Sequence, residues 1–408
     1  MPSLCQSGFT SYNQLSSLWG DNDLMRFTGD PHLIRIALAA VILLLIPNSA
    51  MPGAVEPPIV VAERLIDLEQ TSGLGLETID GTHQLLYRAT KETHKFCHHA
   101  NLVVFNQRLY LMWSNGLVHE DSPWQRILMA WSDDGQTWNS PQWLTGEKQE
   151  ICVAAGFHVH DDTLVAYFTV TGGSNFHPDT ALYAIRSRDG LRWSDRQRIT
   201  GGFFIEGPRA LAKGRLLLAG EHVDPARTEK RMKVLVSDDP SGLGDWREVD
   251  ITPAEVSVFG YTEPALFLSQ KGKRATLLLR NYSGSLYASN SRDNGETWST
   301  PEITAYPDST ARIAAGNLPN GTAYLVNNPS ATQFDRSHLV LGMSRDGVHF
   351  DRAALVRSEP TKMRFEGKSK LDGWQYPHCL SWRRHFYIAY TINKEDVGIT
   401  KIPIRRLR

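Results

Sequence analysis

The stretch Ser132-Asp133-Asp134-Gly135-Gln136-Thr137-Trp138 is the first of five copies of one short pattern. The other copies are Ser187-Arg188-Asp189-Gly190-Leu191-Arg192-Trp193, Ser237-Asp238-Asp239 running to Trp246, Ser291-Arg292-Asp293-Asn294-Gly295-Glu296-Thr297-Trp298, and Ser344-Arg345-Asp346-Gly347-Val348-His349-Phe350. Their first serines lie 55, 50, 54 and 53 residues apart, and a period of that size is typical of repeat architectures. Each copy follows a short run of alternating apolar residues, such as residues 127–131, so each is expected to form a hairpin turn.

Each residue type in the repeat has a structural reason. An Asp side chain accepts hydrogen bonds from backbone N–H groups one or two residues further on, and Gly adopts the positive φ that a chain reversal needs. The aromatic residue that closes each copy is expected to pack beneath the turn. We therefore interpret the Asp and Trp side chains of the repeats as structural and place none of them in an active site.

The composition fits a single large β domain. The chain has 408 residues, of which 41% are hydrophobic and 10% aromatic, with 32 glycines. This suits many short strands joined by tight turns. Because 43 Lys and Arg nearly balance 44 Asp and Glu, nothing global indicates a nucleic-acid partner or an anionic membrane surface. An acidic ligand would have to be bound by locally placed cations. We expect the protein to be a monomer.

The N-terminal region is predicted to be a leader. Residues 36–46 form the only strongly apolar run, and it is too short to span a bilayer readily. Basic residues precede it, and a proline with small residues follows, which is typical of a signal peptide cleaved near Ala50 or Ala54. We interpret residues 1–54 as this leader, with translation starting at Met25, and expect a secreted or periplasmic protein. An uncleaved N-terminal membrane anchor is the alternative.

Residues 55–408 are predicted to form one all-β domain, a six-bladed β-propeller. Each repeat supplies one blade, and a sixth begins at Tyr376 and ends one strand short near Ile404. Residues 59–62 are expected to supply the missing strand. Closing the ring with an N-terminal strand removes the exposed sheet edges that an open array would leave.

The repeats resemble those of a known family. Five Ser-x-Asp-x-Gly-x-x-Trp/Phe turns on a six-blade count resemble the Asp-box, or BNR, repeats of the sialidase (neuraminidase) superfamily over roughly residues 58–406. The resemblance implies a secreted, sialidase-like glycoside hydrolase that cleaves a glycosidic bond to an acidic sugar, of the retaining exo-α-sialidase type. Asp-box propellers also occur in other glycosidases, in polysaccharide lyases and in noncatalytic proteins, so the fold alone does not give the reaction.

Candidate site residues lie at the starts of the innermost strands, because these strands line the central channel of a propeller. Five of the six predicted starts carry titratable groups, and these include His98-His99, Glu206 with Arg209, Glu263, Arg312 and Tyr376. Such a convergent polar centre is typical of a ligand site.

The resemblance implies roles for some of these residues. Sialidases attack the anomeric carbon with a tyrosine that a glutamate activates, an exception among glycosidases. Tyr376 takes the place of this nucleophile, and Glu263 resembles its base. Asp121, in the loop of residues 116–121, resembles the acid/base residue, with Glu120 a near rival.

Arginines hold the substrate carboxylate in the family, since their planar guanidinium groups bind it bidentately. Arg280 and Arg312 resemble the second and third of these arginines. They could instead pair with Glu263 and Asp308 between blades. His98, His99, His119 and Arg209 complete the set of substrate-binding candidates, and the scheme needs no metal and no cofactor.

One position departs from the family pattern. The place of the first arginine holds His98 and His99, and Arg88, ten residues upstream, is an alternative source of that charge. The departure argues against sialic acid itself more than against an acidic oligo- or polysaccharide substrate.

Two other functions stay open. His98, His99 and His119, with Tyr261 or Tyr376 and an arginine, would suit β-elimination from a uronate by a polysaccharide lyase. Exposed aromatic residues could instead stack on sugars in a noncatalytic glycan-binding propeller.

Overall fold

The structure is a computed structural model, and it describes residues 57–172, 177, 179–223, 232–251, 259 and 262–407. The chain divides into two units, Met1–Val55 and Glu56–Arg408. The expected leader and Tyr261 lie outside the described residues.

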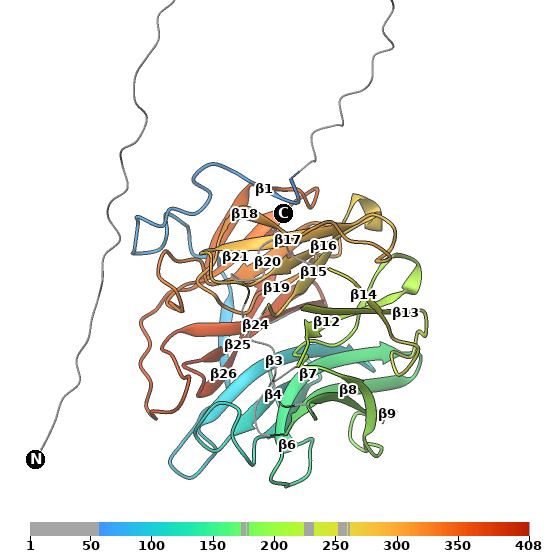
Figure 1. Cartoon of the computed structure of the whole chain (residues 1–408). Helices are drawn as coiled ribbons and strands as arrows, with labels where there is room; N and C mark the ends of the chain where they lie inside the picture. The colour runs from blue at the N-terminus through green and yellow to red at the C-terminus, as the bar shows by residue number, and fades with distance from the viewer. Residues whose placement is uncertain are drawn as a thin grey trace, which may run out of the picture. The chain divides into compact units, whose positions relative to one another are not determined.

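Six four-stranded antiparallel sheets surround a common centre, and each sheet is one blade (Figure 1). Blade one consists of β3 (Phe96–Phe105), β4 (Arg108–Gly116), β5 (Arg126–Ser132) and β6 (Gln142–Trp143). Blade two consists of β7 (Ile151–His160), β8 (Thr163–Thr171), β9 (Ala181–Ser187) and β10 (Gln197–Gly201). Blade three consists of β11 (Arg209–Ala210), β12 (Leu216–Glu221), β13 (Met232–Ser237) and β14 (Arg247–Val249).

The second half of the ring repeats this plan. Blade four consists of β15 (Ala265–Ser269), β16 (Arg274–Leu279), β17 (Ser285–Ser291) and β18 (Glu302–Pro307). Blade five consists of β19 (Ala314–Asn317), β20 (Ala323–Asn327), β21 (Leu339–Ser344) and β23 (Arg352–Arg357). Blade six consists of β24 (Trp374–Trp382), β25 (His385–Ile392), β26 (Asp396–Pro403) and β2 (Thr82–Tyr87). Short 3-10 helices occur at Ala212–Gly214, Gln270–Gly272 and Ile404–Leu407. The predicted all-β, six-bladed propeller is confirmed.

An N-terminal strand completes blade six, but it is not the expected one. Strand β2 pairs antiparallel with β26, with Thr82 opposite Lys401. Residues 59–62 instead contribute β1 (Val60–Val61), which pairs in parallel with β22 (His349–Phe350). The assignment of residues 59–62 to blade six was therefore wrong. The eight-residue edge of β26 is matched by the six residues of β2, whereas β1 offers only two.

The predicted turn chemistry of the repeats is confirmed. In the first copy, Gly135 N–H donates to Ser132 Oγ at 2.8 Å, and the N–H groups of Gln136 and Thr137 donate to Asp134 Oδ1 at 2.8 and 2.7 Å. Equivalent bonds occur in the second and fifth copies. In these three copies, the third residue of the repeat, an Asp, accepts the backbone N–H groups of its own turn, as expected of a structural residue.

These turns also join the blades. Gly135 has φ +69°, and a Cβ there would lie 2.3 Å from the hydroxyl oxygen of Tyr387 in blade six. In the same way, Tyr167 of blade two donates a hydrogen bond to the carbonyl of Gly242 in blade three at 2.9 Å. Each such tyrosine fills the space under the next repeat, which fixes the spacing between neighbouring sheets.

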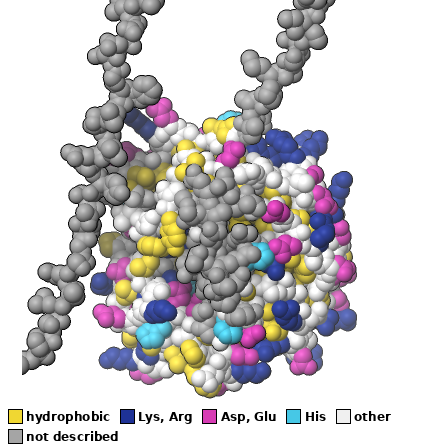
Figure 2. Space-filling model, viewed as in Figure 1, with side chains coloured by type: hydrophobic (Ala, Val, Ile, Leu, Met, Phe, Trp, Pro, Cys, Tyr) yellow, Lys and Arg dark blue, Asp and Glu magenta, His cyan; other side chains and the backbone are white. Residues whose placement is uncertain are grey.

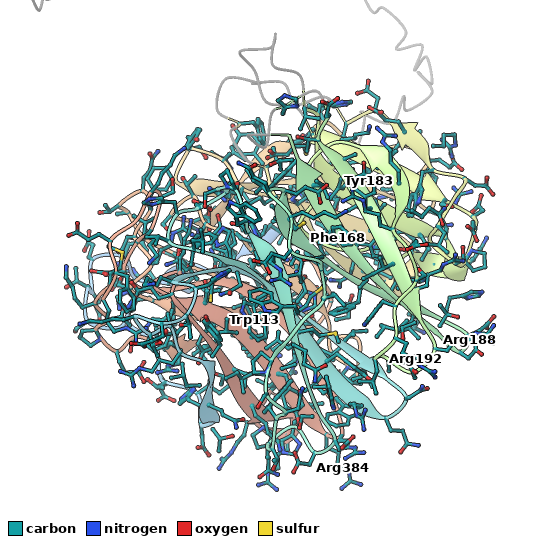
Figure 3. The ribbon with its side chains drawn as sticks, turned by 90° about the horizontal axis from the view of Figure 1, so that it is seen from below. Trp113, Phe168, Tyr183, Arg188, Arg192 and Arg384 are labelled. Atoms are coloured by element: carbon teal, nitrogen blue, oxygen red, sulfur yellow. The ribbon has the colours of Figure 1, made fainter. Side chains whose placement is uncertain are left out.

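The hydrophobic core lies between the blades. Trp113 of blade one is fully buried and packs in one cluster with Tyr387 and Val397 of blade six. In Figure 3, Trp113 lies inside the sheets, whereas Arg188 and Arg192 extend from the outer edge. On the face seen in Figure 2, basic and acidic side chains lie close together with hydrophobic ones scattered among them. None of the helices among the described residues has the length and apolar character needed to cross a membrane.

Candidate active site

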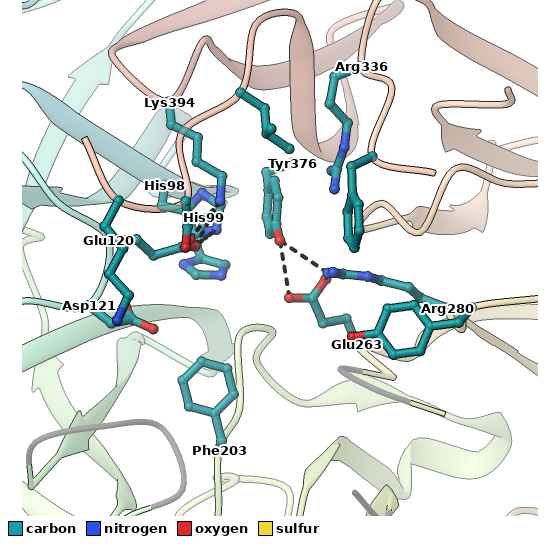
Figure 4. Close-up of a pocket in the computed structure, with 15 residues that line it drawn as sticks. His98, His99, Glu120, Asp121, Phe203, Glu263, Arg280, Arg336, Tyr376 and Lys394 are labelled. Atoms are coloured by element: carbon teal, nitrogen blue, oxygen red, sulfur yellow. Dashed lines mark hydrogen bonds and ion pairs between the residues drawn. The ribbon is translucent and has the colours of Figure 1, made fainter. Parts of the chain in front are cut away.

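A pocket of about 400 Å³ lies where the first strands begin. Adjacent strands are antiparallel, so the starts of first strands share one end of the propeller with the loops between second and third strands. Both kinds of segment supply the lining, which consists of His98, His99, Glu120, Asp121, Phe203, Glu263, Arg280, Tyr282, Phe334, Arg336, Lys368, Ser369, Leu371, Tyr376 and Lys394. Figure 4 shows Glu263 and Arg280 on one side of Tyr376 and His98, Glu120 and Lys394 on the other.

Bulges in the inner strands place two of these side chains. The pairing of β3 with β4 shifts between His98 and Asn101, and that of β24 with β25 shifts between Gln375 and His378. At these bulges His99 and Tyr376 have φ of 49° and 58°. Left-handed backbone is uncommon and costly for such residues, so the surrounding sheet holds them in this conformation.

Tyr376, Glu263 and Arg280 form one bonded group. The Tyr376 hydroxyl donates to Glu263 Oε1 at 3.5 Å, and Arg280 Nη1 donates to the Tyr376 hydroxyl at 3.1 Å. Arg280 also forms an ion pair with Glu263. All three side chains are buried. The structure therefore brings together three residues that the sequence analysis selected from blades four and six.

The charges of this group are strongly coupled. Burial raises the pKa of the Tyr376 phenol, and the Arg280 cation partly opposes that shift. Burial disfavours the Arg280 cation, yet the Glu263 carboxylate outweighs this effect and raises the pKa of Arg280. The resting group thus consists of a neutral phenol beside a charged Arg280–Glu263 pair.

Asp121 faces the pocket from the β4–β5 loop. Gln125 Nε2 donates to Asp121 Oδ1 at 3.3 Å, and the Asp121 N–H donates to Gln125 Oε1 at 3.2 Å. Burial, and then the neighbouring Glu120 carboxylate, raise the pKa of Asp121 to about 7. A carboxyl with such a pKa can both give and take a proton near neutral pH.

Glu120, the other acid/base candidate of this loop, differs from Asp121 because basic side chains surround its carboxylate. Both of its carboxylate oxygens accept hydrogen bonds from Lys394 Nζ, at 2.9 and 2.8 Å. His98 Nε2 lies 2.9 Å from Glu120 Oε1. Lys394 and His98 thus occupy the carboxylate of Glu120, so Asp121 is the better candidate for a proton donor.

The two histidines lie against the tyrosine. The ring centroids of His98 and Tyr376 are 3.7 Å apart, and the His99 ring meets that of Tyr376 edge-on at 5.2 Å. Burial, followed by the nearby Lys394 cation, lowers the pKa of His98 well below its usual value. Burial likewise lowers the pKa of His99. Both rings are therefore neutral at neutral pH and do not replace the charge of an arginine.

Arg336 is one of three pocket cations that the sequence analysis missed, together with Lys368 and Lys394. Its Nη2 donates to the carbonyl of Thr310 at 2.9 Å, and its guanidinium carbon lies 5.7 Å from the Tyr376 ring centroid. Its Nε and Nη1 have no partner among the described residues. Burial lowers the pKa of Arg336, but a guanidinium stays charged. Its position in the β20–β21 loop matches that of Asp121 in the β4–β5 loop, and this parallel could have indicated it.

The structure does not place every predicted residue in this pocket. Arg312 is buried, and its Nη2 donates to Asn101 Oδ1 at 3.4 Å; it does not line the pocket. Arg209 pairs with Glu206 at 2.5 Å and borders a separate cavity of about 280 Å³. The Arg312 side chain points into the interior, and the Arg209 side chain points toward a different cavity. A rule based on strand starts alone does not distinguish these side chains from those that face the pocket.

His119 and Arg88 also lie outside the lining. His119 Nδ1 accepts the N–H of Lys368 at 3.0 Å, so it joins two loops at the rim. Arg88 is exposed after the outermost strand β2 and supplies no charge to the pocket. The cations of the lining are Arg280, Arg336, Lys368 and Lys394. Among the described residues, no group of three or more His, Cys, Asp or Glu side chains is arranged to hold a metal ion.

The arrangement offers a definite chemistry. A buried phenol touches a carboxylate that can take its proton, and Asp121 can act as an acid across the same open space. Two guanidinium groups, Arg280 and Arg336, lie beside the phenol and suit the carboxylate of a bound sugar.

Comparison with known proteins agrees with this fold. The BNR repeat-like domain matches residues 107–388. A comparison with curated proteins gave no match. A solved structure titled "Sialidase" has a TM-score of 0.60 at 20% identity, over 85% of this chain and 35% of that one. The present chain therefore spans about a third of that protein.

Two further sialidase structures are similar. The Hadza microbial sialidase Hz136 has a TM-score of 0.62 at 17% identity, over 79% of this chain and 69% of that one. Trypanosoma rangeli sialidase in complex with sialic acid has a TM-score of 0.60 at 14% identity, over 81% and 60%. At these identities the likeness establishes the fold, and together with the family match it shows that the chain belongs to the BNR repeat-like family and has a sialidase-like six-bladed propeller.

Proposed function

We propose that the protein is a sialidase-like glycoside hydrolase that cleaves a glycosidic bond to an acidic sugar with retention of configuration. The observation that carries the proposal is the contact of the buried Tyr376 hydroxyl with Glu263 and Arg280 in a pocket that also holds Asp121. A packed structural tyrosine needs neither a base nor a second carboxylic acid across an open pocket.

Tyr376 is the proposed nucleophile. Glu263 takes the phenolic proton as the Tyr376 oxygen attacks the anomeric carbon, and Arg280 stabilises the negative charge that develops on that oxygen. The sugar's own carboxylate lies next to this carbon in an acidic sugar of the sialic acid type. A neutral phenol therefore avoids the repulsion that a carboxylate nucleophile would meet.

Asp121 is the proposed acid/base residue. Protonated at its pKa of about 7, it gives its proton to the leaving glycosidic oxygen as the bond to the anomeric carbon breaks. The resulting carboxylate then takes a proton from the water that attacks the tyrosyl-linked sugar. Water adds to the anomeric carbon, Tyr376 leaves, and Glu263 returns its proton.

Arg280 and Arg336 are the proposed carboxylate clamp, in place of the expected pair Arg280 and Arg312. The Nε and Nη1 of Arg336, which have no partner among the described residues, support this role, since buried guanidinium nitrogens left unbonded gain most from an anionic ligand. The substrate would be an acidic oligo- or polysaccharide, encountered outside the cytoplasm if residues 1–54 are a cleaved leader.

The test compares Tyr376→Phe with Tyr183→Phe. Tyr183 lies on the third strand of blade two (Figure 3), stacks on Phe168 and is not part of the pocket lining. Screening on aryl glycosides of acidic sugars should show turnover by the wild type and Tyr183→Phe and none by Tyr376→Phe. NMR of the first product should show the anomeric configuration of the substrate. Full activity of Tyr376→Phe would contradict the proposal.

A uronate lyase is the second candidate, and the packing of neutral His98 and His99 on Tyr376 favours it. In that reaction Arg280 and Arg336 would neutralise the uronate carboxylate. The neutral His99 would take the α-proton, and the Tyr376 phenol would give its proton to the leaving glycosidic oxygen. The masses of the products separate the two reactions, because hydrolysis adds a water molecule and elimination does not. Glu263 favours hydrolysis, since elimination gives it no role.

A further inference from the structure

The Glu120 carboxylate is fixed in one position beside the candidate acid. It accepts two bonds from Lys394 Nζ and one contact from His98 Nε2, and its own N–H donates to the carbonyl of Lys368 at 3.3 Å. Lys394 comes from the β25–β26 turn of blade six, and Lys368 from the segment before β24. The β25–β26 turn and β3 therefore hold the carboxylate, and the segment before β24 holds the backbone of the same residue.

The network of Glu120, Lys394 and His98 takes no part in the proposed bond-breaking and bond-forming steps. Lys394 Nζ lies 5.2 Å from the Tyr376 ring centroid. Its charge is compensated by the Glu120 carboxylate, because both carboxylate oxygens accept a hydrogen bond from it. His98 is neutral and donates its Nε2 proton to Glu120. Neither cation nor imidazole is thus free to hold a substrate carboxylate in the place of the family's first arginine.

What the network does face is Asp121. On the same loop, Glu120 is its direct neighbour and Gln125 its hydrogen-bond donor. Other elements of the pocket also present charged or titratable groups to Asp121. These are Lys394 of the β25–β26 turn, Glu263 of blade four, Lys368, the neutral His98 and His99 of β3, and, beyond Tyr376, Arg280 and Arg336.

We propose that Glu120, held by Lys394 and His98, is a positioning residue that controls the protonation of Asp121 and thereby the pH range of the proposed hydrolysis. A fixed negative charge beside Asp121 opposes its ionisation, and Lys394 limits this effect by compensating part of the charge. The proposal rests on the proposed function for its catalytic consequence only. The direct effect on Asp121 does not depend on any activity.

The two charges act with opposite sign, which makes the proposal testable. Glu120→Gln removes the like charge, so the Asp121 carboxylate forms more easily and its pKa falls. Lys394→Met removes the opposing cation and leaves Glu120 uncompensated, so the pKa of Asp121 rises. A nearby charge typically moves a carboxyl pKa by about one unit or more.

The first measurement is the pH profile of kcat/KM, whose alkaline limb reports deprotonation of the acid. We expect Glu120→Gln to move this limb to lower pH and Lys394→Met to move it to higher pH, each by about one unit. The double variant should return toward the wild-type limb. A merely structural role would lower activity in both variants without moving the limbs in opposite directions.

The second measurement needs no substrate. In protein with 13C-labelled aspartate carboxyl groups, the Asp121 signal is identified by its absence in Asp121→Asn, and its titration is followed by NMR in each variant. Glu296→Gln is the matched control, since Glu296 also bonds two cations, Arg215 and Arg247, but lies away from the pocket. It should leave the titration unchanged.

The outcomes separate the two proposals. Opposite shifts of the Asp121 titration support the role of Glu120 even if no acidic glycoside is hydrolysed, in which case only the proposed function fails. Hydrolysis with an Asp121 titration that both variants leave unchanged, or move in the same direction, would overturn the role of Glu120 and leave the function standing.

Discussion

Two aspartates of blade one show how one residue type serves two purposes. Asp134, in the first repeat, accepts the backbone N–H groups of Gln136 and Thr137, and these bonds hold its pKa below the usual value. Asp121, in the preceding loop, has one weak side-chain donor, and burial and then the neighbouring Glu120 carboxylate raise its pKa to about 7. Burial and the donors that surround a carboxyl group, rather than its place in the chain, separate the structural aspartate from the chemical one.

The largest expected effect is on catalysis. Asp121→Asn should lower kcat/KM for a substrate with a poor leaving group by roughly 10²–10⁴-fold, since general acid catalysis contributes about that much. Asp134→Asn should leave kcat/KM unchanged, because its hydrogen bonds serve only the turn. Initial rates on the same acidic glycoside check both. A comparable loss in both variants would erase the distinction between the two aspartates.

The next effect concerns Arg336, which the sequence analysis missed, and Arg312, which it placed in the carboxylate clamp. Arg336→Met should raise KM for an acidic substrate roughly tenfold to hundredfold, as expected for the loss of a charge-assisted hydrogen bond. Arg312→Met should leave KM unchanged, because Arg312 does not line the pocket. Steady-state kinetics of the two variants measure this. An equal rise in KM for Arg312→Met would show that Arg312 also binds the substrate carboxylate.

A smaller effect tests the structural region. Gly135→Ala places a Cβ at φ +69°, 2.3 Å from the Tyr387 hydroxyl oxygen. We expect a loss of about 2 kcal/mol in the free energy of unfolding, from overpacking and backbone strain. Gly146→Ala is the control, since no atom lies within 4 Å of the added Cβ. Urea denaturation compares them, and equal stability would show that the turn does not need glycine.

The smallest effect is the pH dependence of stability. The pKa of Asp121 is raised to about 7 from its usual 3.8, so its contribution to stability is present below the unfolded value and is lost as the pH rises through 7. Asp121→Asn lacks this loss. Its melting temperature should therefore exceed that of the wild type by roughly 2 °C at alkaline pH, with the difference closing on acidification. A pH-independent difference would contradict the raised pKa.

The sequence revealed what depends on local chemistry. The repeats were readable because Ser, Asp and Gly satisfy one another within a few residues, and their period gave the blade count. Tyr376 and Glu263 were found because the inner strands must face the channel. The resemblance to sialidases then linked them to Arg280 on the next strand.

The remainder depends on how the ring closes. Arg336 lies in a loop whose length no repeat fixes, and only the assembled propeller brings it beside Tyr376. The Lys394–Glu120 pair joins blade six to blade one, across the closure that β2 completes. Arg312 followed the strand-start pattern, yet its side chain is buried outside the pocket. Side-chain direction at a bulge or before a strand is decided by neighbouring blades, which spacing does not encode.

The most direct test of the account is to trap the sugar on the nucleophile. Asp121→Asn treated with an acidic glycoside that carries an activated leaving group needs no acid for the first step and lacks the base for the second. After rapid quenching and proteolysis, mass spectrometry should find the sugar attached to the peptide that contains Tyr376. Turnover without any adduct on Tyr376, or a product lacking the added water, would contradict the account.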